Sequence, residues 1–177
     1  ILEGLLANDL RATCPNAVVA HPKGILGGVD HLLTGRVERI DVAFLQTLLE
    51  HDIIPVVPPL GCDGAGNSYR LNSDSVAVEV AKALRAIKLV FLTTEGGVRN
   101  AAGAVVRQLT VEEAEAYLKR HKADLAPNAL TKLGHAVRAG KEGVERVHVI
   151  DGREQEGLLG EVFSNEGIGT LVYANVY

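Results

Sequence analysis

The sequence predicts an α/β protein, a three-layer sandwich with a mainly parallel sheet, formed as one domain over residues 1–177. Short β-branched runs alternate with helical stretches in which apolar residues recur every three to four positions. Glycine-rich turns follow several of the runs, and a helix begins directly after a turn. This order is typical of parallel sheets covered by helices on both faces.

The composition suits one soluble globular domain, with 47% apolar and 23% charged residues. A net charge of −4 gives no basic face for nucleic acid or an anionic membrane. No apolar run approaches the ~18 residues of a membrane span, and no secretory signal opens the chain. Cys14 and Cys62 are too few for a disulfide framework. We therefore expect a cytoplasmic protein in which both cysteines are buried as small hydrophobes.

Capping residues and periodicity define the elements in the first half. A short strand lies within Asn16–Ala20, and Asp41 caps a helix. A strand covers residues 53–57, and a helix runs from about Ser73 to Ala86. The inward faces of the two helices are expected to carry Val42, Leu45, Leu48 and Leu49, and then Val76, Val80 and Leu84.

The second half alternates strands and helices in the same way. Thr110 opens a capping box with Glu113. A later helix is expected to end at Gly140 as its left-handed stop. His148 lies within an apolar strand, which favours a hydrogen-bonded structural histidine. The expected elements are a strand at 88–93, a helix from about 128, a strand at 145–150, a short helix at 157–163 and a strand at 170–174.

Residues 53–74 contain the pattern most directly linked to a ligand. A β-branched run is followed by a loop with three glycines, and Asn72-Ser73-Asp74 then opens a helix. At such a strand end, free backbone N–H groups and the helix dipole favour a small polar or anionic ligand. By itself, this pattern identifies no particular ligand.

Residues 53–98, with their Arg70-Leu71-Asn72-Ser73-Asp74 segment, resemble the amino-acid kinase family in its N-acetylglutamate kinase and synthase branch. The resemblance includes TGRVERID at 34–41, GVERVHVIDG at 143–152 and LLGEVFSNEGIGT at 158–170, and it covers roughly residues 27–175. It implies the amino-acid-kinase fold. The PPLG string at 58–61 favours the synthases.

The resemblance implies a kinase-like site with Lys132 and Asp74 as catalytic residues. Lys132 matches a lysine that stabilises charge on a transferring phosphoryl group, and Asp74 an aspartate that orients catalytic lysines. Arg70 stands where the kinases place a substrate-binding asparagine, and an arginine can still clamp a carboxylate. The alternatives are a solvated lysine at 132 and a plain helix cap at Asn72 or Ser73. The implied substrate-binding residues are Gly61, Arg70 and Asn72.

The nucleotide side of this site departs from the kinase pattern. Thr94 replaces the kinase aspartate before Gly96 and Gly97, the weakly implied nucleotide-binding residues. The K-x-G-G strand and H-G-G-G loop of the kinases are absent from the sequence. We therefore expect a chain truncated at both ends relative to its parent and inactive alone.

The carboxyl-terminal motif implies the feedback site for L-arginine of arginine-sensitive family members. Glu161, Gly167, Gly169 and Thr170 match it position by position. A carboxylate can bind the ligand's cationic groups, and glycine lets the backbone come close. The alternative is an ordinary helix–turn–strand connection with a surface glutamate. On either interpretation, replacing Glu161 is expected to leave the fold intact.

The preferred function is the arginine-sensing, kinase-like domain of N-acetylglutamate synthase, an enzyme of arginine biosynthesis. The parent enzyme would transfer an acetyl group from acetyl-CoA to L-glutamate. One alternative is N-acetylglutamate kinase, which would use ATP and Mg²⁺ on N-acetyl-L-glutamate; another is a stand-alone arginine-binding module. The family resemblance implies a homo-oligomer. The histidine and cysteine spacing predicts no metal site.

Overall fold

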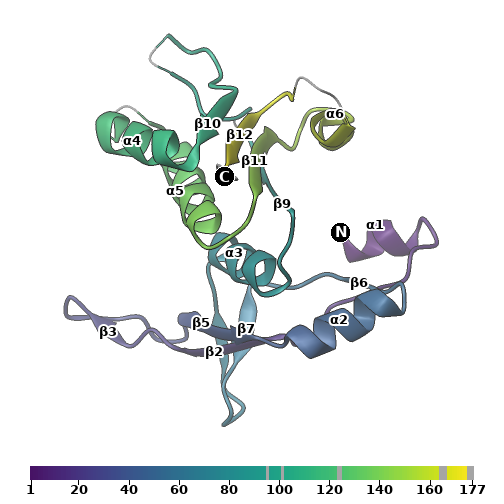
Figure 1. Ribbon diagram of the computed structural model, residues 1–177. Helices are drawn as coiled ribbons and strands as arrows, with labels where there is room; N and C mark the ends of the chain where they lie inside the picture. Colours follow the sequence, from purple (N-terminus) through teal and green to yellow (C-terminus); the bar gives the residue numbers. More distant parts are fainter. Residues whose placement is uncertain (95, 101, 123–124, 164–166, 175–177) are drawn as a thin grey trace. The chain divides into compact units, whose positions relative to one another are not determined.

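A computed structural model describes residues 1–94, 96–100, 102–122, 125–163 and 167–174. The chain divides into two compact units, Ile1–Leu84 and Arg85–Tyr177. Both units combine helices with β-sheets, in which parallel and antiparallel pairs are mixed (Figure 1). The α/β prediction is therefore confirmed. One domain over residues 1–177 remains a prediction.

The first unit contains a four-stranded sheet in the order β5-β2-β7-β8. The strand β2 (Val18–Pro22) pairs antiparallel with β5 (Gly35–Ile40) and parallel with β7 (Leu60–Cys62). The last strand, β8 (Ser68–Arg70), is antiparallel to β7. The helix α3 (Ser73–Ala83) contacts β5. The core of this unit comprises Ala17, Val18, Ala20, Ile40, Leu45, Tyr69, Leu71 and Val76.

Asp41 caps the helix α2 as predicted, because its side chain accepts a hydrogen bond of 3.0 Å from the backbone N–H of Phe44. The predicted apolar face of α2 was too wide. Leu45 is fully buried, whereas Leu49 is 48% exposed. The other elements of this unit are α1 (Leu2–Leu6), β1 (Ala12–Thr13), β3 (Ile25–Leu26), β4 (Val29–Asp30), α2 itself (Val42–Glu50) and β6 (Ile54–Pro55).

The second unit contains a four-stranded sheet in the order β10-β12-β11-β9. The strand β11 (Arg146–Asp151) is parallel to β9 (Lys88–Thr93) and antiparallel to β12 (Thr170–Tyr173). The edge strand β10 (Gln108–Thr110) is parallel to β12. The predicted strand at 88–93 is confirmed residue for residue.

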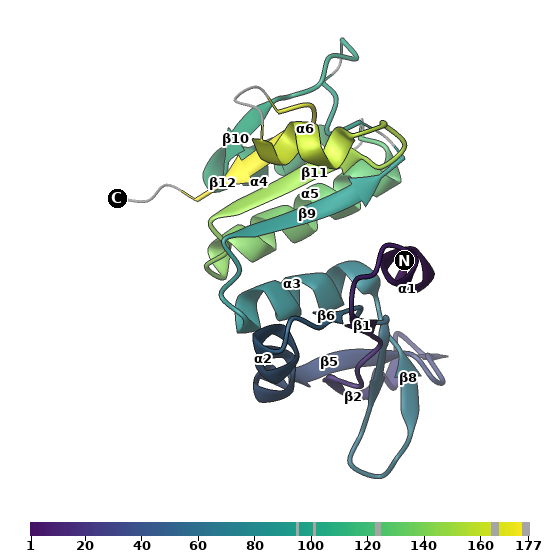
Figure 2. The ribbon, with the colours of Figure 1, turned by 90° about the vertical axis from the view of Figure 1, so that its right-hand side faces the viewer.

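Helices cover both faces of this second sheet. The helices α4 (Val111–His121) and α5 (Pro127–Lys141) pack on one face, and α6 (Gly157–Phe163) lies on the other (Figures 1 and 2). After Arg146, every residue of β11 is buried, as expected for a strand between two helical layers. The short helix predicted at 157–163 is therefore confirmed, and it stands apart from α4 and α5.

The capping box of α4 is confirmed. The Thr110 side chain accepts from the Glu113 backbone N–H at 3.1 Å, and the Glu113 carboxylate accepts from the Thr110 N–H at 2.8 Å. The predicted end of α5 at Gly140 is wrong, because the helix continues to Lys141 and the left-handed glycine is Gly143, at φ +100°. Gly140 instead lies against Val111, where an added Cβ would be 2.5 Å from Cγ2.

The prediction for the cysteines is also wrong. Cys14 is exposed and Cys62 is half-buried, and both are free thiols. Cys14 lies just after β1, a strand of only two residues. In the part of the chain that the structure describes, every helix is too short or too polar to cross a membrane.

Candidate functional site

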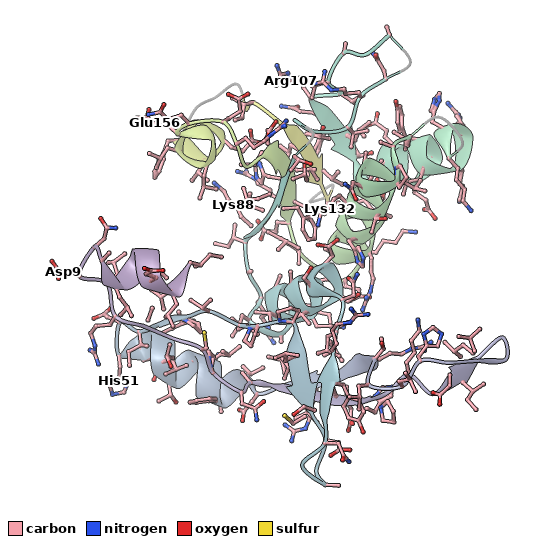
Figure 3. All side chains as sticks on the ribbon, turned by 180° about the vertical axis from the view of Figure 1, so that it is seen from behind. Asp9, His51, Lys88, Arg107, Lys132 and Glu156 are labelled. Carbon is pink, nitrogen blue, oxygen red and sulfur yellow. The ribbon has the colours of Figure 1, made fainter. Side chains whose placement is uncertain are left out.

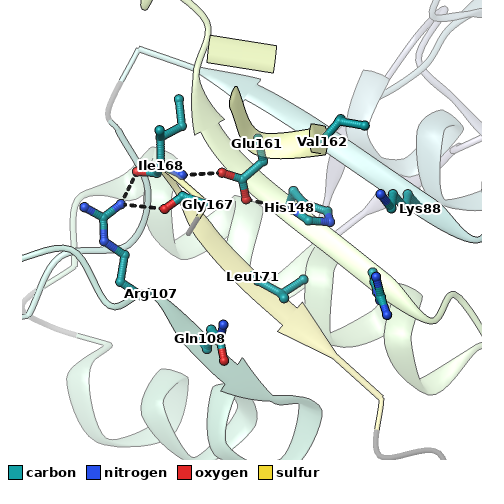
Figure 4. A pocket seen from close by; sticks show the side chains of 10 residues that line it. Lys88, Arg107, Gln108, His148, Glu161, Val162, Gly167, Ile168 and Leu171 are labelled. Atoms are coloured by element: carbon teal, nitrogen blue, oxygen red, sulfur yellow. Dashed lines mark hydrogen bonds and ion pairs between the residues drawn. The ribbon is translucent and has the colours of Figure 1, made fainter. Parts of the chain in front are cut away.

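A cavity of about 520 Å³ lies on the α6 side of the second sheet (Figure 4). This volume falls within the usual range for small-molecule sites. The strands supply the floor, and α6 with the segment before β12 supplies the wall. The lining residues are Lys88, Arg107, Gln108, Arg146, His148, Glu161, Val162, Gly167, Ile168 and Leu171.

Strand register explains why residues distant in sequence line the same cavity. His148 of β11 is paired with Leu171 of β12, which in turn is paired with Gln108 of β10. Arg146 is two residues before His148 and is paired with Lys88 of β9. Side chains at paired positions, and at positions two apart, point to the same face of a sheet. The pairing therefore places all five side chains on one face.

Glu161 forms the centre of the cavity wall. It is 5% exposed, and one carboxylate oxygen accepts hydrogen bonds from the backbone N–H groups of Ile168 at 2.6 Å and Gly169 at 3.0 Å. The other oxygen is 2.7 Å from Nδ1 of His148. The interpretation of Glu161 as a surface glutamate is therefore wrong, and these contacts argue against a replacement without loss of stability. A turn folded back over α6 buries the carboxylate, and the sequence pattern does not reveal this.

The electrostatics of Glu161 follow from these contacts. Burial raises the pKa of its carboxyl, but hydrogen bonds from His148, Gly169 and Ile168 outweigh burial and hold the pKa below its usual value of 4.5. The group is therefore an anion at neutral pH. An ionised carboxylate only accepts hydrogen bonds, so Nδ1 of His148 must carry the proton that it donates.

His148 is a buried, hydrogen-bonded histidine, as predicted, and it is 6% exposed. Its second nitrogen, Nε2, is buried without a hydrogen-bond partner among the described residues. In the neutral ring Nε2 is an acceptor, because Nδ1 holds the proton. A ligand N–H group in the cavity can satisfy this atom. Sequence reasoning missed this unpaired nitrogen, because an apolar strand pattern does not indicate which ring nitrogen finds a partner.

Arg107 is another cavity residue that sequence reasoning missed. Its guanidinium donates to the backbone carbonyls of Gly167, at 3.2 Å, and Ile168 (Figure 4). Gly167 leaves no room for a side chain, because an added Cβ would lie 2.8 Å from both Glu161 carboxylate oxygens. Arg107 and Glu161 thus hold the turn from opposite sides, one through its carbonyls and the other through its N–H groups.

The other two residues of the carboxyl-terminal motif are absent from the cavity lining. Thr170 is fully buried, and its hydroxyl accepts a hydrogen bond of 2.8 Å from the Val98 backbone N–H. Gly169 packs so tightly on β11 that an added Cβ would overlap the Val149 carbonyl. Of the four predicted arginine-binding residues, Glu161 and Gly167 therefore line the cavity, while Gly169 and Thr170 hold the turn beside it. Residues 164–166 of the motif lie outside the described residues.

The second predicted site begins in the first unit. Asn72 caps α3 as expected, accepting a hydrogen bond of 2.9 Å from the Ser75 N–H. Asp74 is buried in the first turn of α3, at 8% exposure, and Arg70 is exposed at the end of β8. Gly61 faces Ala20, whose Cβ would be 2.7 Å from an added Cβ. Packing thus explains the glycine, and ligand binding by these residues remains a prediction.

The remaining predicted residues lie in the second unit. Thr94, Gly96 and Gly97 follow β9, while Glu95 lies outside the described residues. Lys132 lies on α5 (Figure 3). Its ammonium group is 5.3 Å from the centre of the Phe91 ring, a cation–π contact. Asp74 belongs to the first unit and Lys132 to the second. Their joint action is therefore still a prediction.

Asp151 is the buried carboxylate at the end of β11, the strand beside β9. Its oxygens accept from the Arg153 guanidinium at 2.7 and 3.0 Å, and these hydrogen bonds hold the pKa of Asp151 well below its usual range. Sequence reasoning missed this pair, although DGR follows a predicted strand. Among the described residues, no group of three histidine, cysteine or acidic side chains is placed to hold a metal ion.

Comparison with known proteins places the chain in one protein family. Residues 1–151 match the amino acid kinase family. The chain is 40% identical over 147 residues to the acetylglutamate kinase of Nitrosospira multiformis, and this match covers 83% of the chain and 50% of that protein. It is 37% identical over 141 residues to the acetylglutamate kinase of Campylobacter jejuni, covering 78% and 49%. The chain therefore spans about half the length of these relatives.

Solved structures add a second group of similar proteins. The structure resembles N-acetylglutamate synthase from Neisseria gonorrhoeae complexed with coenzyme A and L-arginine, with a TM-score of 0.87 and 30% identity, covering 93% of this chain and 38% of that one. For the same synthase with coenzyme A and N-acetyl-glutamate, the TM-score is 0.91 at 29% identity, with 99% and 40% coverage. Giardia carbamate kinase, at 14% identity and a TM-score of 0.69, shares the fold alone.

Proposed function

The chain belongs to the amino acid kinase family, and from that starting point we propose that it is the L-arginine-binding, kinase-like domain of an N-acetylglutamate synthase. The observation that supports this proposal most directly is the cavity lined by Glu161, Gly167 and His148. Its wall carries a buried anion at the place where the motif predicts contact with a cationic ligand. The similar Neisseria synthase was crystallised with L-arginine.

The cavity can recognise the cationic end of arginine through its hydrogen-bond acceptors. Nε2 of His148 accepts from a guanidinium N–H, while Glu161 fixes the ring tautomer that makes this possible. The Glu161 carboxylate has about four acceptor positions, of which three protein donors occupy three. The negative charge of Glu161, a side chain that is 5% exposed, also attracts the guanidinium electrostatically.

Acetyl transfer from acetyl-CoA to L-glutamate is assigned to another domain of the parent protein. This chain would then serve as the regulatory part, and arginine would act as the feedback ligand of its own biosynthetic route. The chain covers only 38–40% of the similar synthase structures, which leaves room for a further domain in a synthase of that kind. Homo-oligomer formation and a cytoplasmic location belong to the same proposal.

The test of this proposal is calorimetric titration of the protein with L-arginine, D-arginine and L-citrulline. Citrulline keeps the shape of arginine but loses its positive charge, so its affinity should be about ten- to a hundredfold lower, the usual value of a charge-assisted contact. D-arginine should also bind more weakly. Equal binding of arginine and citrulline would contradict recognition through the Glu161–His148 end of the cavity.

The second candidate is N-acetylglutamate kinase, favoured by relatives of that name at 37–40% identity. Lys132 and Asp74 would act at the phosphoryl group, while Arg70, Asn72 and Gly61 would bind N-acetyl-L-glutamate. ATP and Mg²⁺ would be required, with Gly96 and Gly97 beside the nucleotide. Because Thr94 stands in the position of the kinase aspartate, the described residues fit this chemistry less well. A third candidate is a stand-alone arginine-binding module. It would bind arginine in the same cavity, but it would catalyse neither acetyl transfer nor phosphorylation.

A coupled assay of ADP release separates the two enzymes. The synthase proposal expects no turnover of ATP that depends on N-acetylglutamate. Turnover that Lys132→Ala abolishes, while Lys119→Ala on α4 leaves it unchanged, would overturn the synthase proposal in favour of the kinase.

A further inference from the structure

The turn at residues 167–171 has a second face, directed away from the cavity. Leu171 lines the cavity, and Thr170 precedes it on β12. Adjacent residues of a strand point to opposite faces of the sheet, so Thr170 points away from the cavity. Thr170 is fully buried, and its hydroxyl accepts a hydrogen bond of 2.8 Å from the backbone N–H of Val98, 72 residues earlier in the chain. Thr170 thus joins the turn to the loop that follows β9.

Gly97 shows how closely this loop fits against Thr170. A Cβ added to Gly97 would lie 2.8 Å from the Thr170 hydroxyl oxygen and 3.2 Å from the Thr170 backbone nitrogen. The next residue, Val98, is fully buried. A buried N–H group that loses its acceptor is costly, so the Val98 N–H and the Thr170 hydroxyl should stay together when either segment moves.

The segment that begins at Val98 returns to the same turn at Arg107. The backbone carbonyl of Arg107 accepts a hydrogen bond of 2.9 Å from the Leu171 N–H. The Arg107 guanidinium donates to the carbonyls of Gly167 and Ile168 (Figure 4). Both ends of this segment, Val98 and Arg107, are therefore fastened to the turn that borders the cavity.

The loop that Thr170 holds lies at a distinct edge of the sheet. Residues 96–98 follow the carboxyl end of β9, which is parallel to its neighbour β11. In α/β sheets, ligands bind outside the carboxyl ends of parallel strands. A change in the position or order of residues 96–98 would therefore alter an edge that is suited to a second ligand.

We propose that Thr170 is a positioning residue that couples the cavity to the loop at residues 96–98, so that L-arginine bound in the cavity orders this loop. The proposal rests on the arginine-binding function above, to which it adds the route by which the bound ligand acts on another part of its unit. A ligand that contacts Gly167 and Leu171 restricts the turn, and with it the Thr170 hydroxyl that accepts from Val98.

This coupling must act in both directions. If bound arginine stabilises the contact between the loop and Thr170, then a change that forces the loop away from Thr170 must weaken arginine binding by the same factor. Such a change lies outside the cavity lining and removes no contact with the ligand. The affinity for arginine therefore reports on the coupling itself.

Calorimetric titration with L-arginine compares two glycines between β9 and β10. Gly97→Ala places a methyl group against the Thr170 hydroxyl and should lower arginine affinity about tenfold. Gly103→Ala is the matched control, because Gly103 also has a positive φ, +79°, but an added Cβ there would meet open space. It should leave arginine affinity unchanged.

NMR of ¹⁵N-labelled protein then tests the hydroxyl of Thr170. In wild type, saturating L-arginine should shift the Val98 amide and slow its hydrogen exchange about tenfold. Thr170→Ser keeps the hydroxyl and should retain both effects. Thr170→Val keeps the shape but removes the acceptor, so both effects should disappear while the amides of Ile168 and Leu171 still shift.

Three results would overturn the coupling while leaving the arginine site in place. They are equal arginine affinity in the two glycine variants, a Val98 amide of wild type that does not respond to arginine, and a full response of Val98 in Thr170→Val. Should Thr170→Val fail to fold, the two glycine variants decide. Failure of L-arginine to bind wild type at all would instead overturn the proposed function.

Discussion

The Nδ1 atom of His148 lies 2.7 Å from a carboxylate oxygen of Glu161, and both side chains are buried. This contact joins β11 to α6 across 13 residues of sequence. It also fixes the ring tautomer, because the ionised carboxylate accepts a hydrogen bond from Nδ1–H and leaves Nε2 as the acceptor of the neutral ring. The His148–Glu161 pair is therefore expected to contribute both to the stability of the cavity wall and to ligand recognition.

Replacing Glu161 should destabilise the protein. Glu161→Ala leaves His148 Nδ1 and the N–H groups of Ile168 and Gly169 without their acceptor, which should lower the free energy of unfolding by about 3 kcal/mol. Glu161→Gln should lower it less, since an amide oxygen can still accept from both N–H groups. Urea unfolding measures both values. Glu154→Gln, at an exposed glutamate near α6, is the control. A loss from Glu161→Ala no larger than that of the control would contradict the hydrogen bonding described.

The contribution of Glu161 to the free energy of unfolding should decrease as the pH falls. Its pKa in the folded protein is lowered, so its stabilising effect is fully present above the unfolded value of 4.5 and is lost as the pH falls through the folded pKa. Unfolding of wild type and Glu161→Gln should be compared between pH 3 and 7. Their difference in stability should be constant above the unfolded value and should narrow at lower pH. A difference that widens in acid would contradict the assignment.

Asp63 should titrate below the usual range of an aspartate. Hydrogen bonds from the Asn67 side chain and backbone, and from Tyr69 and Ala65, lower its pKa to about 2. Carboxyl ¹³C NMR should give a midpoint near this value for Asp63. Asp63→Asn should increase amide exchange in the turn between β7 and β8. A midpoint near 4 would mean that the turn does not hold this carboxylate.

Two glycines of α5 should respond in opposite directions to alanine. Gly134→Ala should stabilise the protein by up to about 1 kcal/mol, because the site has space and alanine favours helix. Gly140→Ala should destabilise it, since the new methyl group would lie 2.5 Å from Cγ2 of Val111. Thermal unfolding of the two variants is the measurement. Equal stabilisation by both would show that α4 and α5 are not in close contact at Gly140.

The sequence allowed much of this fold to be predicted, because caps and periodicity are local properties. The strand at 88–93, the capping box at Thr110 and the helix at 157–163 lie where the local pattern places them. The end of α5 was misassigned, because the sequence offers two glycines, Gly140 and Gly143, as the left-handed residue after the helix. Only the structure shows that Gly140 instead provides room for the side chain of Val111.

The site was harder to predict, since it depends on contacts between distant segments. The carboxyl-terminal motif correctly drew attention to Glu161 and Gly167, which line the cavity. It did not reveal that Glu161 is buried, or that Lys88 and Arg107 join it there. Those features arise from the pairing of β9, β11 and β12, and no local sequence window contains that register.

NMR titration with L-arginine tests the proposed site most directly. In ¹⁵N-labelled protein, shifts should concentrate on His148, including its Nε2 resonance, and on the amides of residues 167–171. The amides of residues 61–75, where N-acetylglutamate is the predicted ligand, should remain unchanged. Saturable shifts at His148 and the 167–171 turn are the expected result. Shifts confined to residues 61–75, or no shifts at millimolar arginine, would contradict arginine binding in this cavity.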